Sequence, residues 1–389
     1  MTKFLAGNQI QLLRNGAAFF PALETAITNA VSEVYLQTYI YEVDKAGILI
    51  GSALKKAAQR GVTVNILLDG FGCKDLPASY VNELELAGVQ VMFYRPKISP
   101  WTFKKSRLRR LHRKVSVIDG KVGFVGGINI IDDYNVPDNT PPRLDYAVRV
   151  EGNLLPSMLT SVHKLWRRIA LAHLQPHHLN TNKLKVTSVK SQYMAKDDIK
   201  AAFLLRDNML HRRTIENAYL SAIAHAQSEV IIANAYFVPG RKFRRALLSA
   251  ANRGVSVKLL LQGRLEYFLM FATHAFYSVF LKNGIQIYEY RQGFMHSKVA
   301  VIDSEWATVG SSNIDPFSLL LAREANVVVQ DKNFAAELRT DIMLSIQNGA
   351  YHVSSHEWTR GHTIKRFVSW IAFGLVRVFV GLIGNAKEL

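Results

Sequence analysis

The chain has 389 residues, of which 49% are hydrophobic, 10% aromatic and 20% charged. This composition can build a large core, which excludes an intrinsically disordered protein, and the length predicts two or three domains. The single cysteine, Cys73, excludes an internal disulfide framework and fits a reducing compartment. The formal net charge of +18 favours a polyanionic partner, either nucleic acid or an anionic membrane surface. The N-terminal residues lack the pattern of a signal peptide.

One strand–helix–strand pattern occurs twice along the chain. In the first half, residues 34–41 are typical of a strand, residues 48–62 of an amphipathic helix, and residues 62–70 of a second strand. The same order returns in the second half, at residues 229–237, 242–255 and 255–263. Strands that alternate with helices predict parallel βαβ units with helices on both faces of the sheet. We therefore expect an α/β fold of two similar α/β/α lobes.

The remaining segments predict how the lobes are connected. A polar, less regular stretch lies between the repeats, and the chain ends with a basic stretch followed by an apolar one. We expect a first lobe over residues 1–175, a linker over 176–205, a second lobe over 206–357 and a membrane-associating tail over 358–389.

Each half also carries the same four polar residue types, His, Lys, Asp and Asn, at one spacing. They are His112, Lys114, Asp119 and Asn129 in the first half and His296, Lys298, Asp303 and Asn313 in the second. A single His-x-Lys in a strand is usually a solvated edge, but two matching copies argue against that explanation. Residues i and i+2 of a strand face the same way, so each histidine projects with its lysine. Two such pairs that meet across a pseudo-two-fold axis would form one pocket.

This pocket suits a phosphoryl group. The two lysines would neutralise it, and its oxygens would be bound by backbone amides near the motif glycines and by Asn129, Ser311 and Asn313. One histidine would attack phosphorus and form a phosphohistidine, while the other protonates the leaving oxygen and then deprotonates an alcohol or water. No carboxylate cluster suited to magnesium is evident, so we expect no metal and no cofactor.

A catalytic histidine needs a partner on its other ring nitrogen. Two further strand-like segments, DYAVRVEG and EANVVVQD, each begin with a carboxylate, Asp145 and Glu324. We expect these two side chains to orient the histidines. Asp119 and Asp303 lie at the far end of each motif strand, where they are candidates for fixing a turn or pairing with a basic residue.

The duplicated motifs, HRKVSVIDGKVGFVGGIN and HSKVAVIDSEWATVGSSN, resemble those of the phospholipase D superfamily. With DYAVRVEG, EVIIANAYFVPG and EANVVV, the whole chain looks like the short, B-type bacterial cardiolipin synthases. This resemblance implies a bilobal fold with one active site between the lobes. It also implies transfer of a phosphatidyl group, from phosphatidylglycerol to the hydroxyl of another phosphatidylglycerol, with release of glycerol. The implied catalytic set is His112, Lys114, Asp119, His296, Lys298 and Asp303, with His112 as the nucleophile.

The superfamily also contains nucleases, so the substrate needs support from the chain itself. Residues 95–114 hold nine lysines and arginines together with Trp101 and Phe103. Such a loop suits an anionic membrane slightly better than a nucleic-acid backbone. Residues 264–284 are a helix-length apolar run, typical either of a core helix or of a membrane-facing wall.

The C-terminal residues favour lipid more strongly. In the seventeen residues 367–383 only Ser369 and Arg377 are conventionally polar. This run is short for a membrane span and contains an arginine, so a helix in the membrane interface fits it better, with a helix packed on the core as the alternative. The nearby His352, His356 and His362 show no metal-binding pattern and are expected on the surface.

The sequence therefore predicts a peripheral enzyme of phospholipid synthesis on the cytoplasmic side of a bacterial inner membrane. Its expected partners are phospholipid substrates and an anionic membrane surface, without nucleic acid. A phospholipase D-type hydrolase or nuclease with the same histidine chemistry is the alternative enzyme, and a binding module with a relic site is a third possibility. The sequence indicates no oligomeric state.

Overall fold

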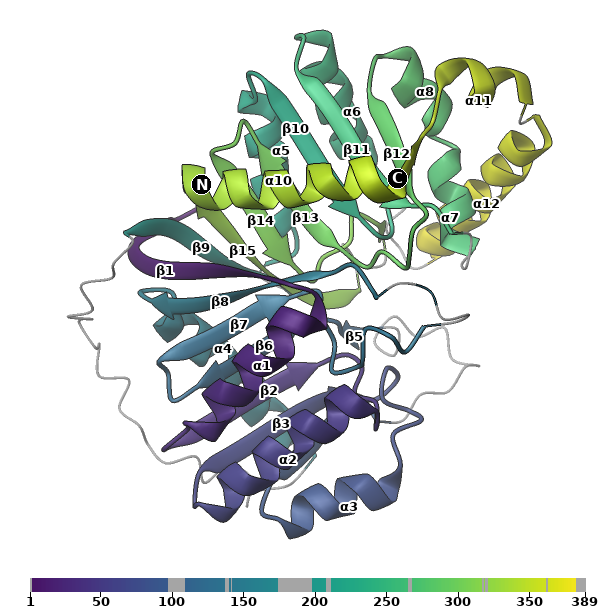
Figure 1. Cartoon of the computed structure of the whole chain (residues 1–389). Coiled ribbons are helices and arrows are strands. Elements are labelled where there is room, and N and C mark those ends of the chain that lie inside the picture. Colours follow the sequence, from purple (N-terminus) through teal and green to yellow (C-terminus); the bar gives the residue numbers. More distant parts are fainter. Residues whose placement is uncertain are drawn as a thin grey trace.

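The computed structural model describes residues 2–96, 109–136, 140, 142–173, 198–207, 211–264, 268–316, 318, 321–361 and 363–382. Two lobes of the same architecture lie one above the other in Figure 1, the first in purple to teal and the second in green to yellow. Each lobe has a mixed sheet with helices on both faces, which confirms the predicted pair of α/β/α lobes.

The first lobe runs from the first strand to the long helix that follows Gly152. Its elements are β1 (Leu5–Arg14), α1 (Asn15–Thr28), β2 (Glu33–Thr38), α2 (Lys45–Gln59), β3 (Thr63–Asp69), α3 (Ala78–Leu86), β4 (Gln90–Tyr94), β5 (Arg110–Leu111), β6 (Lys114–Ile118), β7 (Val122–Gly126), β8 (Tyr146–Gly152) and α4 (Leu155–Ala172).

The second lobe repeats this order and adds elements at its C-terminal end. It comprises β9 (Ile199–Arg206), α5 (Thr214–His225), β10 (Glu229–Asn234), α6 (Arg241–Asn252), β11 (Ser256–Gln262), α7 (Phe268–His274), α8 (Tyr277–Lys282), β12 (Gln286–Tyr290), β13 (Lys298–Ile302), β14 (Trp306–Gly310), β15 (Ala322–Gln330), α10 (Lys332–Gly349), β16 (Ala350–His352), α11 (Ser355–Gly361) and α12 (Thr363–Leu382).

One continuous sheet passes through both lobes. Its order is β16-β12-β11-β10-β13-β14-β15-β9-β1-β8-β7-β6-β2-β3-β4, so the lobes join where β1 pairs with β9. Along this order β2-β3-β4 and β10-β11-β12 pair in parallel, and the short strand β5 pairs in parallel with β15 off this path. The motif strands β6 and β13 are antiparallel to both neighbours, which the predicted parallel units did not include. A tight hairpin joins each motif strand to the next strand, and Asp119 and Gly120, or Asp303 and Ser304, have positive φ there.

The strands are buried on both faces because helices cover both. In β2, Val34 and Leu36 pack under the outer helices α1, α2 and α3, while Tyr35 faces the opposite way. In the second lobe, α5 and α6 cover the corresponding outer face. The helix starts are fixed locally: Asp44 accepts hydrogen bonds from two amides at the start of α2, and Asp331 accepts one at the start of α10.

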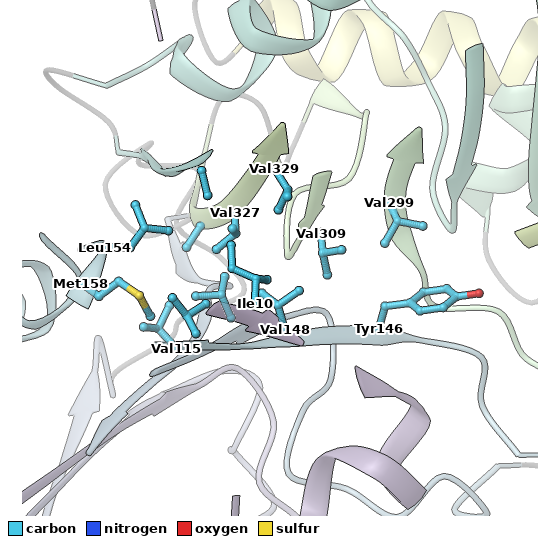
Figure 2. Close-up of a cluster of buried hydrophobic side chains, with 14 of the residues drawn as sticks. Ile10, Val115, Tyr146, Val148, Leu154, Met158, Val299, Val309, Val327 and Val329 are labelled. Carbon is cyan, nitrogen blue, oxygen red and sulfur yellow. The ribbon is translucent and has the colours of Figure 1, made fainter. Parts of the chain in front are cut away.

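A shared core holds the two lobes against each other. Figure 2 shows Ile10, Val115 and Val148 of the first lobe beside apolar side chains of the second. Those from the second lobe are Val299, Val309, Val327 and Val329. The inner helices α4 and α10 add side chains to the same cluster. Because this core is shared, the lobes form one rigid frame for residues placed at their junction.

The start of the second lobe differs from the expected one. Strand β9 begins at Ile199 and pairs with β1 and β15, so we place the start of the second lobe inside the expected linker 176–205. Its residues Ile199, Ala201 and Ala202 are buried, which explains why this segment folds as a strand. Residues 174–197 and most of the basic loop 95–114 lie outside the described residues.

The C-terminal apolar segments pack on the second lobe. The run 264–284 contains two short helices, α7 and α8. Ala272 of α7, Phe276 between the helices and Phe280 of α8 are buried in the core. Helix α12 lies beside α7 in Figure 1, and its Phe373 packs edge-to-face on Phe276 with ring centroids 4.9 Å apart. None of the described helices has both the length and the apolar character needed to cross a bilayer.

Candidate active site

The two His-x-Lys motifs meet at the junction of the lobes, and each is held there by the opposite lobe. The backbone amides of His112 and Arg113 donate to the carbonyl of Arg323, at 3.1 and 2.7 Å. In the mirror arrangement, the amide of His296 donates to the carbonyl of Leu144 at 2.8 Å. Each motif is therefore fixed by the residue that precedes the other lobe's carboxylate.

The carboxylates also cross between the lobes. His112 Nδ1 lies 2.9 and 3.1 Å from the two carboxylate oxygens of Glu324, and His296 Nδ1 lies 2.7 Å from Asp145 Oδ2. An ionised carboxylate only accepts hydrogen bonds, so both Nδ1 atoms carry the hydrogen. Each neutral imidazole then has its lone pair on Nε2. This geometry places Asp145 and Glu324 where they can fix the orientation and tautomer of the histidines.

The two carboxylates are supported differently. The hydroxyl of Ser311 donates to Glu324 Oε2 at 2.5 Å and accepts from the Ala325 amide at 3.1 Å. In the first lobe, Gly127 occupies the equivalent position, and a Cβ there would lie 2.2 Å from Asp145 Oδ1. Ser311 is fully buried, so we assign it to positioning Glu324 in place of the phosphate-binding role that the sequence predicted.

The two lysines lie close together in a buried setting. Lys114 Nζ donates to the carbonyl of His112 at 2.7 Å, and Lys298 Nζ donates to the carbonyl of His296. Lys298 Nζ also lies 4.0 Å from Asp145 Oδ2. Burial and the charge of Lys298 lower the pKa of Lys114 to about 7, and burial lowers the pKa of Lys298 to about 8. An anion bound between these lysines would oppose both shifts, which makes the site electrostatically suited to a phosphate.

The histidines are neutral in this environment. Burial lowers the pKa of His112, against the opposing charge of Glu324, and burial with the charges of Lys298 and Lys114 holds the pKa of His296 well below its usual value. The imidazoles keep 15% and 13% of their side-chain surface exposed, whereas the Lys298 side chain has none. The histidines are thus the members of the set that a substrate phosphorus can reach.

The two motif asparagines are buried but are not equivalent. Asn129 Oδ1 accepts a hydrogen bond from the Ile40 amide at 3.1 Å, which leaves its Nδ2 group as the donor available to a ligand. Asn313 Oδ1 has no hydrogen-bond partner among the described residues. Phosphate binding by Asn129 and Asn313 therefore stays a proposal.

The structure does not place Asp119 and Asp303 with the histidines. They follow the last residues of β6 and β13, roughly 16 Å along the strand from the lysines. Asp119 accepts from the amides of Val31, Ser32 and Glu33 at 2.8–2.9 Å. Asp303 accepts from three amides in the equivalent loop, those of Gln227, Ser228 and Glu229. We therefore assign both carboxylates a structural role in place of the catalytic role that the resemblance implied.

Three further residues, which were not predicted, contact the set, support it or act on its charge. Tyr39 lies against His112 with ring centroids 4.9 Å apart and under Lys114 Nζ at 5.3 Å. Asp69 accepts from the Leu111 amide at 2.6 Å and so holds the segment just before His112. Arg143 adds positive charge that lowers the pKa of His296. Tyr39 and Asp69 lie at the carboxyl ends of β2 and β3. Ligand sites lie at this edge of a parallel sheet, so their positions in the sequence could have predicted that they are near the site.

This arrangement holds two neutral imidazoles with free Nε2 atoms, two ammonium groups and two carboxylates, one of each from each lobe. Among the described residues, no group of three or more His, Cys, Asp and Glu side chains is placed to hold a metal ion. The duplicated set suits nucleophilic attack on phosphorus by one histidine and proton transfer by the other.

A family model described as "Cardiolipin synthase, PLD-like domain" matches residues 23–139 and 219–343, which include both motifs. The chain belongs to this family. It is 38% identical to cardiolipin synthase B of Salmonella typhi and 36% identical to that of Escherichia coli K12, in each case over 97% of this chain and 90% of the relative. It is 32% identical to cardiolipin synthase A of Pseudomonas fluorescens, over 91% of this chain and 71% of the relative.

Solved structures confirm the fold. The phosphatidylserine synthase of Haemophilus influenzae matches with a TM-score of 0.72, over 99% of this chain and 97% of that one, at 14% sequence identity. The polyphosphate kinase of Porphyromonas gingivalis matches with a TM-score of 0.56, over 90% of this chain and 49% of that one, at 15% identity. At these identities the likeness concerns the fold alone.

Proposed function

We propose that this family member is a phosphatidyltransferase that joins two molecules of phosphatidylglycerol into cardiolipin and releases glycerol. The observation that carries the proposal is the reciprocal pair of histidine–carboxylate contacts, His112 with Glu324 and His296 with Asp145. The identity to proteins named cardiolipin synthase B, over almost the whole chain, favours this reaction over hydrolysis or nucleic-acid cleavage.

In the proposed first half-reaction, Nε2 of His112 attacks the phosphorus of one phosphatidylglycerol. The bound anionic phosphodiester offsets the charges of Lys298 and Lys114, which raises the pKa of His296 so that its Nε2 takes up a proton. The P–N bond then forms, the bond from phosphorus to the headgroup glycerol breaks, and the departing oxygen takes this Nε2 proton from His296. Lys114 and Lys298 neutralise the phosphate oxygens as charge builds up on them. The product of this step is glycerol and a phosphatidyl group bound to the histidine.

In the second half-reaction, the headgroup hydroxyl of another phosphatidylglycerol gives its proton to His296. Its oxygen attacks phosphorus, the P–N bond breaks, and cardiolipin leaves with His112 in its starting state. Glu324 and Asp145 keep both Nδ1 atoms protonated throughout, so Nε2 does the chemistry in both steps. This cycle uses no metal ion and no cofactor.

We also propose that the enzyme works as a peripheral protein on the cytoplasmic side of a bacterial inner membrane, without a nucleic-acid partner. The net charge of +18 supports attraction to an anionic membrane surface. The single cysteine, which is buried and unpaired, fits a reducing compartment.

The test is to incubate the purified full-length chain with phosphatidylglycerol as the sole lipid and to identify the products by mass spectrometry. We expect cardiolipin and glycerol in equal amounts, and none from the His112→Ala/His296→Ala control. Phosphatidic acid with glycerol and no cardiolipin would show a hydrolase instead. Nicking of plasmid DNA at a comparable rate, with no lipid product, would show a nuclease.

A further inference from the structure

Helix α12 has two apolar faces, and the described residues cover only one of them. Ala372, Phe373 and Val376 are buried against the second lobe, and Ser369 is buried on the same side. The other side carries large apolar side chains that are 41–61% exposed. These are Val368, Trp370, Ile371, Leu375 and Val378, and we call them the α12 stripe.

The stripe is continuous along the helix. Ile371, Leu375 and Val378 are spaced by four and three residues, so they follow one another along one line of the helix surface. A single exposed apolar side chain needs no explanation, but a contiguous apolar surface marks an interaction site. A stripe that is exposed on a helix whose other face is packed is suited to lie flat in the boundary between lipid headgroups and acyl chains.

A basic cluster lies beside the stripe, at the start of helix α6. Arg241, Lys242 and Arg245 are exposed there, and the described helix contains no acidic residue. Burial, and then the charges of Arg241, Arg377 and Arg245, lower the pKa of Arg244, so each of these three arginines lies near Arg244. We call Arg241, Lys242, Arg244 and Arg245 the α6 cluster.

Packing joins the cluster to α12. The Arg244 guanidinium lies 4.6 Å from the centroid of the Phe276 ring, and Phe276 contacts Phe373 of α12. Arg377, on the flank of the stripe, belongs to the same group of charges. The apolar stripe and the positive charges therefore share one side of the second lobe.

This side adjoins the catalytic residues. Strand β10 ends at Asn234, which pairs with Lys298 in the sheet, and α6 begins seven positions later at Arg241. The α6 cluster thus lies at the same edge of the sheet as the His-x-Lys motif.

We propose that the α12 stripe and the α6 cluster form one docking face for an anionic phospholipid bilayer. The apolar side chains would enter the bilayer surface while the arginines and the lysine bind lipid phosphates, and the active-site edge would then face the membrane. This proposal rests on the proposed function, because an enzyme whose substrates lie in a bilayer must bind to its surface. Binding of the protein to vesicles can be measured separately from cardiolipin formation, so the two proposals can be tested apart.

The first experiment measures binding of the full-length chain to vesicles of phosphatidylcholine, with and without 30% phosphatidylglycerol, at about 0.1 M salt. We expect Ile371→Ser/Leu375→Ser/Val378→Ser to weaken binding at least about tenfold on both vesicles, because apolar area no longer leaves water. Arg241→Glu/Arg245→Glu should remove most of the preference for phosphatidylglycerol, since each basic residue near the surface strengthens binding about fivefold.

Matched controls come from the opposite edge of the sheet. Leu86 is 90% exposed at the end of α3, so Leu86→Ser removes apolar surface away from the proposed face. Lys56→Glu/Lys121→Glu makes the same change in net charge as the arginine pair, at exposed lysines near that edge. Both controls should bind vesicles as the wild type does.

A second measurement does not depend on weakened binding. Cys73 is the only cysteine and is buried, so Val378→Cys or Leu86→Cys can carry a polarity-sensitive fluorophore alone. Vesicles with phosphatidylglycerol should shift the emission of the label at 378 to the blue and leave that at 86 unchanged. An unchanged label at 378 on vesicle-bound protein would overturn the proposal. A shift that appears without lipid and grows with protein concentration would show self-association and would also overturn it.

The docking face and the proposed reaction fail in different ways. Variants of the stripe and the cluster should keep wild-type turnover on short-chain phosphatidylglycerol dispersed in detergent, because no catalytic residue is changed. Wild-type vesicle binding by the stripe variant would refute the docking face and leave the reaction intact. Vesicle binding without cardiolipin formation by the wild type would refute the reaction and leave the docking face intact.

Discussion

His112 and Glu324 are 212 positions apart in the chain, yet His112 Nδ1 lies 2.9 Å from Glu324 Oε1. The reciprocal contact, His296 Nδ1 to Asp145 Oδ2 at 2.7 Å, joins residues 151 positions apart. Neither lobe thus contains a complete histidine–carboxylate pair. The site exists only when the lobes are docked, and the shared core between them is what sets its geometry.

The crossed contacts predict the effect of neutralising a carboxylate. Glu324→Gln and Asp145→Asn should each lower kcat by about 10²–10⁴, because an amide can donate to Nδ1 and move the histidine's hydrogen to Nε2. Glu83→Gln, which alters only an exposed ion pair with Lys55, is the matched control and should keep full activity. Loss of less than threefold in both site variants would contradict the orienting role.

Asp119 and Asp303 should matter for stability and not for the chemical step. Removing the carboxylate in Asp119→Ala leaves three backbone amides without their acceptor, which should lower the free energy of unfolding by about 1–2 kcal/mol. Denaturant titration measures this loss, and kcat per folded molecule should stay within about threefold of wild type. A thousandfold loss of kcat in a folded Asp119→Ala or Asp303→Ala enzyme would restore the catalytic role.

The same carboxylates predict how stability depends on pH. Burial alone would raise the pKa of Asp119 and Asp303, but the hydrogen bonds from backbone amides outweigh it and lower both pKa values. Their stabilisation is therefore complete above the usual pKa of about 4 and is lost as the pH falls through the lower folded-state values. The alanine variants should lose less stability than the wild type on acidification over that range.

The lysines predict an alkaline limit on activity. Each lysine is charged below its own pKa, which is about 7 for Lys114 and about 8 for Lys298. Each loses its charge as the pH rises through that value. We expect kcat/KM on detergent-dispersed phosphatidylglycerol to fall above pH 7–8, because it reports the free enzyme. A bound phosphate raises both pKa values, so kcat should fall only at higher pH. If kcat/KM stays flat to pH 9.5, the lysines do not bind the phosphate in their charged form.

Metal independence is a further prediction. Lys114 and Lys298 supply the positive charge that magnesium supplies in other phosphoryl-transfer sites, so excess EDTA should leave the rate of cardiolipin formation within about twofold. The control adds EDTA together with magnesium or calcium in excess. Abolition of activity by EDTA, with recovery on adding one divalent ion, would contradict the proposed chemistry.

Much of this site could be predicted from the sequence, because the spacing of the His, Lys, Asp and Asn residues repeats in the two halves. The period-two pattern placed His112 with Lys114, and the second copy placed His296 with Lys298, so a single pocket followed from symmetry. The sequence could not predict that each carboxylate contacts the histidine of the other lobe. Only the docking of the lobes decides whether Glu324 reaches His112 or His296. The support of Glu324 by Ser311 depends on the same tertiary contact.

The errors in the predicted fold have local causes. Asp119 and Asp303 were candidates for fixing a turn, but the antiparallel pairing that follows each motif strand was not predicted, although Asp119-Gly120 between two apolar runs is a hairpin signal. Strand β9 was taken for part of a linker because its alternating pattern, IKAAFLLR, follows a polar stretch. On α12, Ser369 is one of the two polar residues and is nevertheless buried, whereas large apolar side chains such as Leu375 are exposed. Helical periodicity gives the faces of a helix but not which face meets the core.

The central claim is that histidines from the two lobes share one reaction through a phosphohistidine. The direct measurement is mass spectrometry of enzyme quenched in alkali during turnover with phosphatidylglycerol, for the wild type, His112→Ala and His296→Ala. We predict a phosphatidyl adduct on His112 that accumulates in His296→Ala, no adduct in His112→Ala, and at least about a thousandfold lower turnover in both variants. An adduct on His296 in the His112→Ala enzyme would reverse the roles, and near-normal turnover of either variant would contradict the shared site.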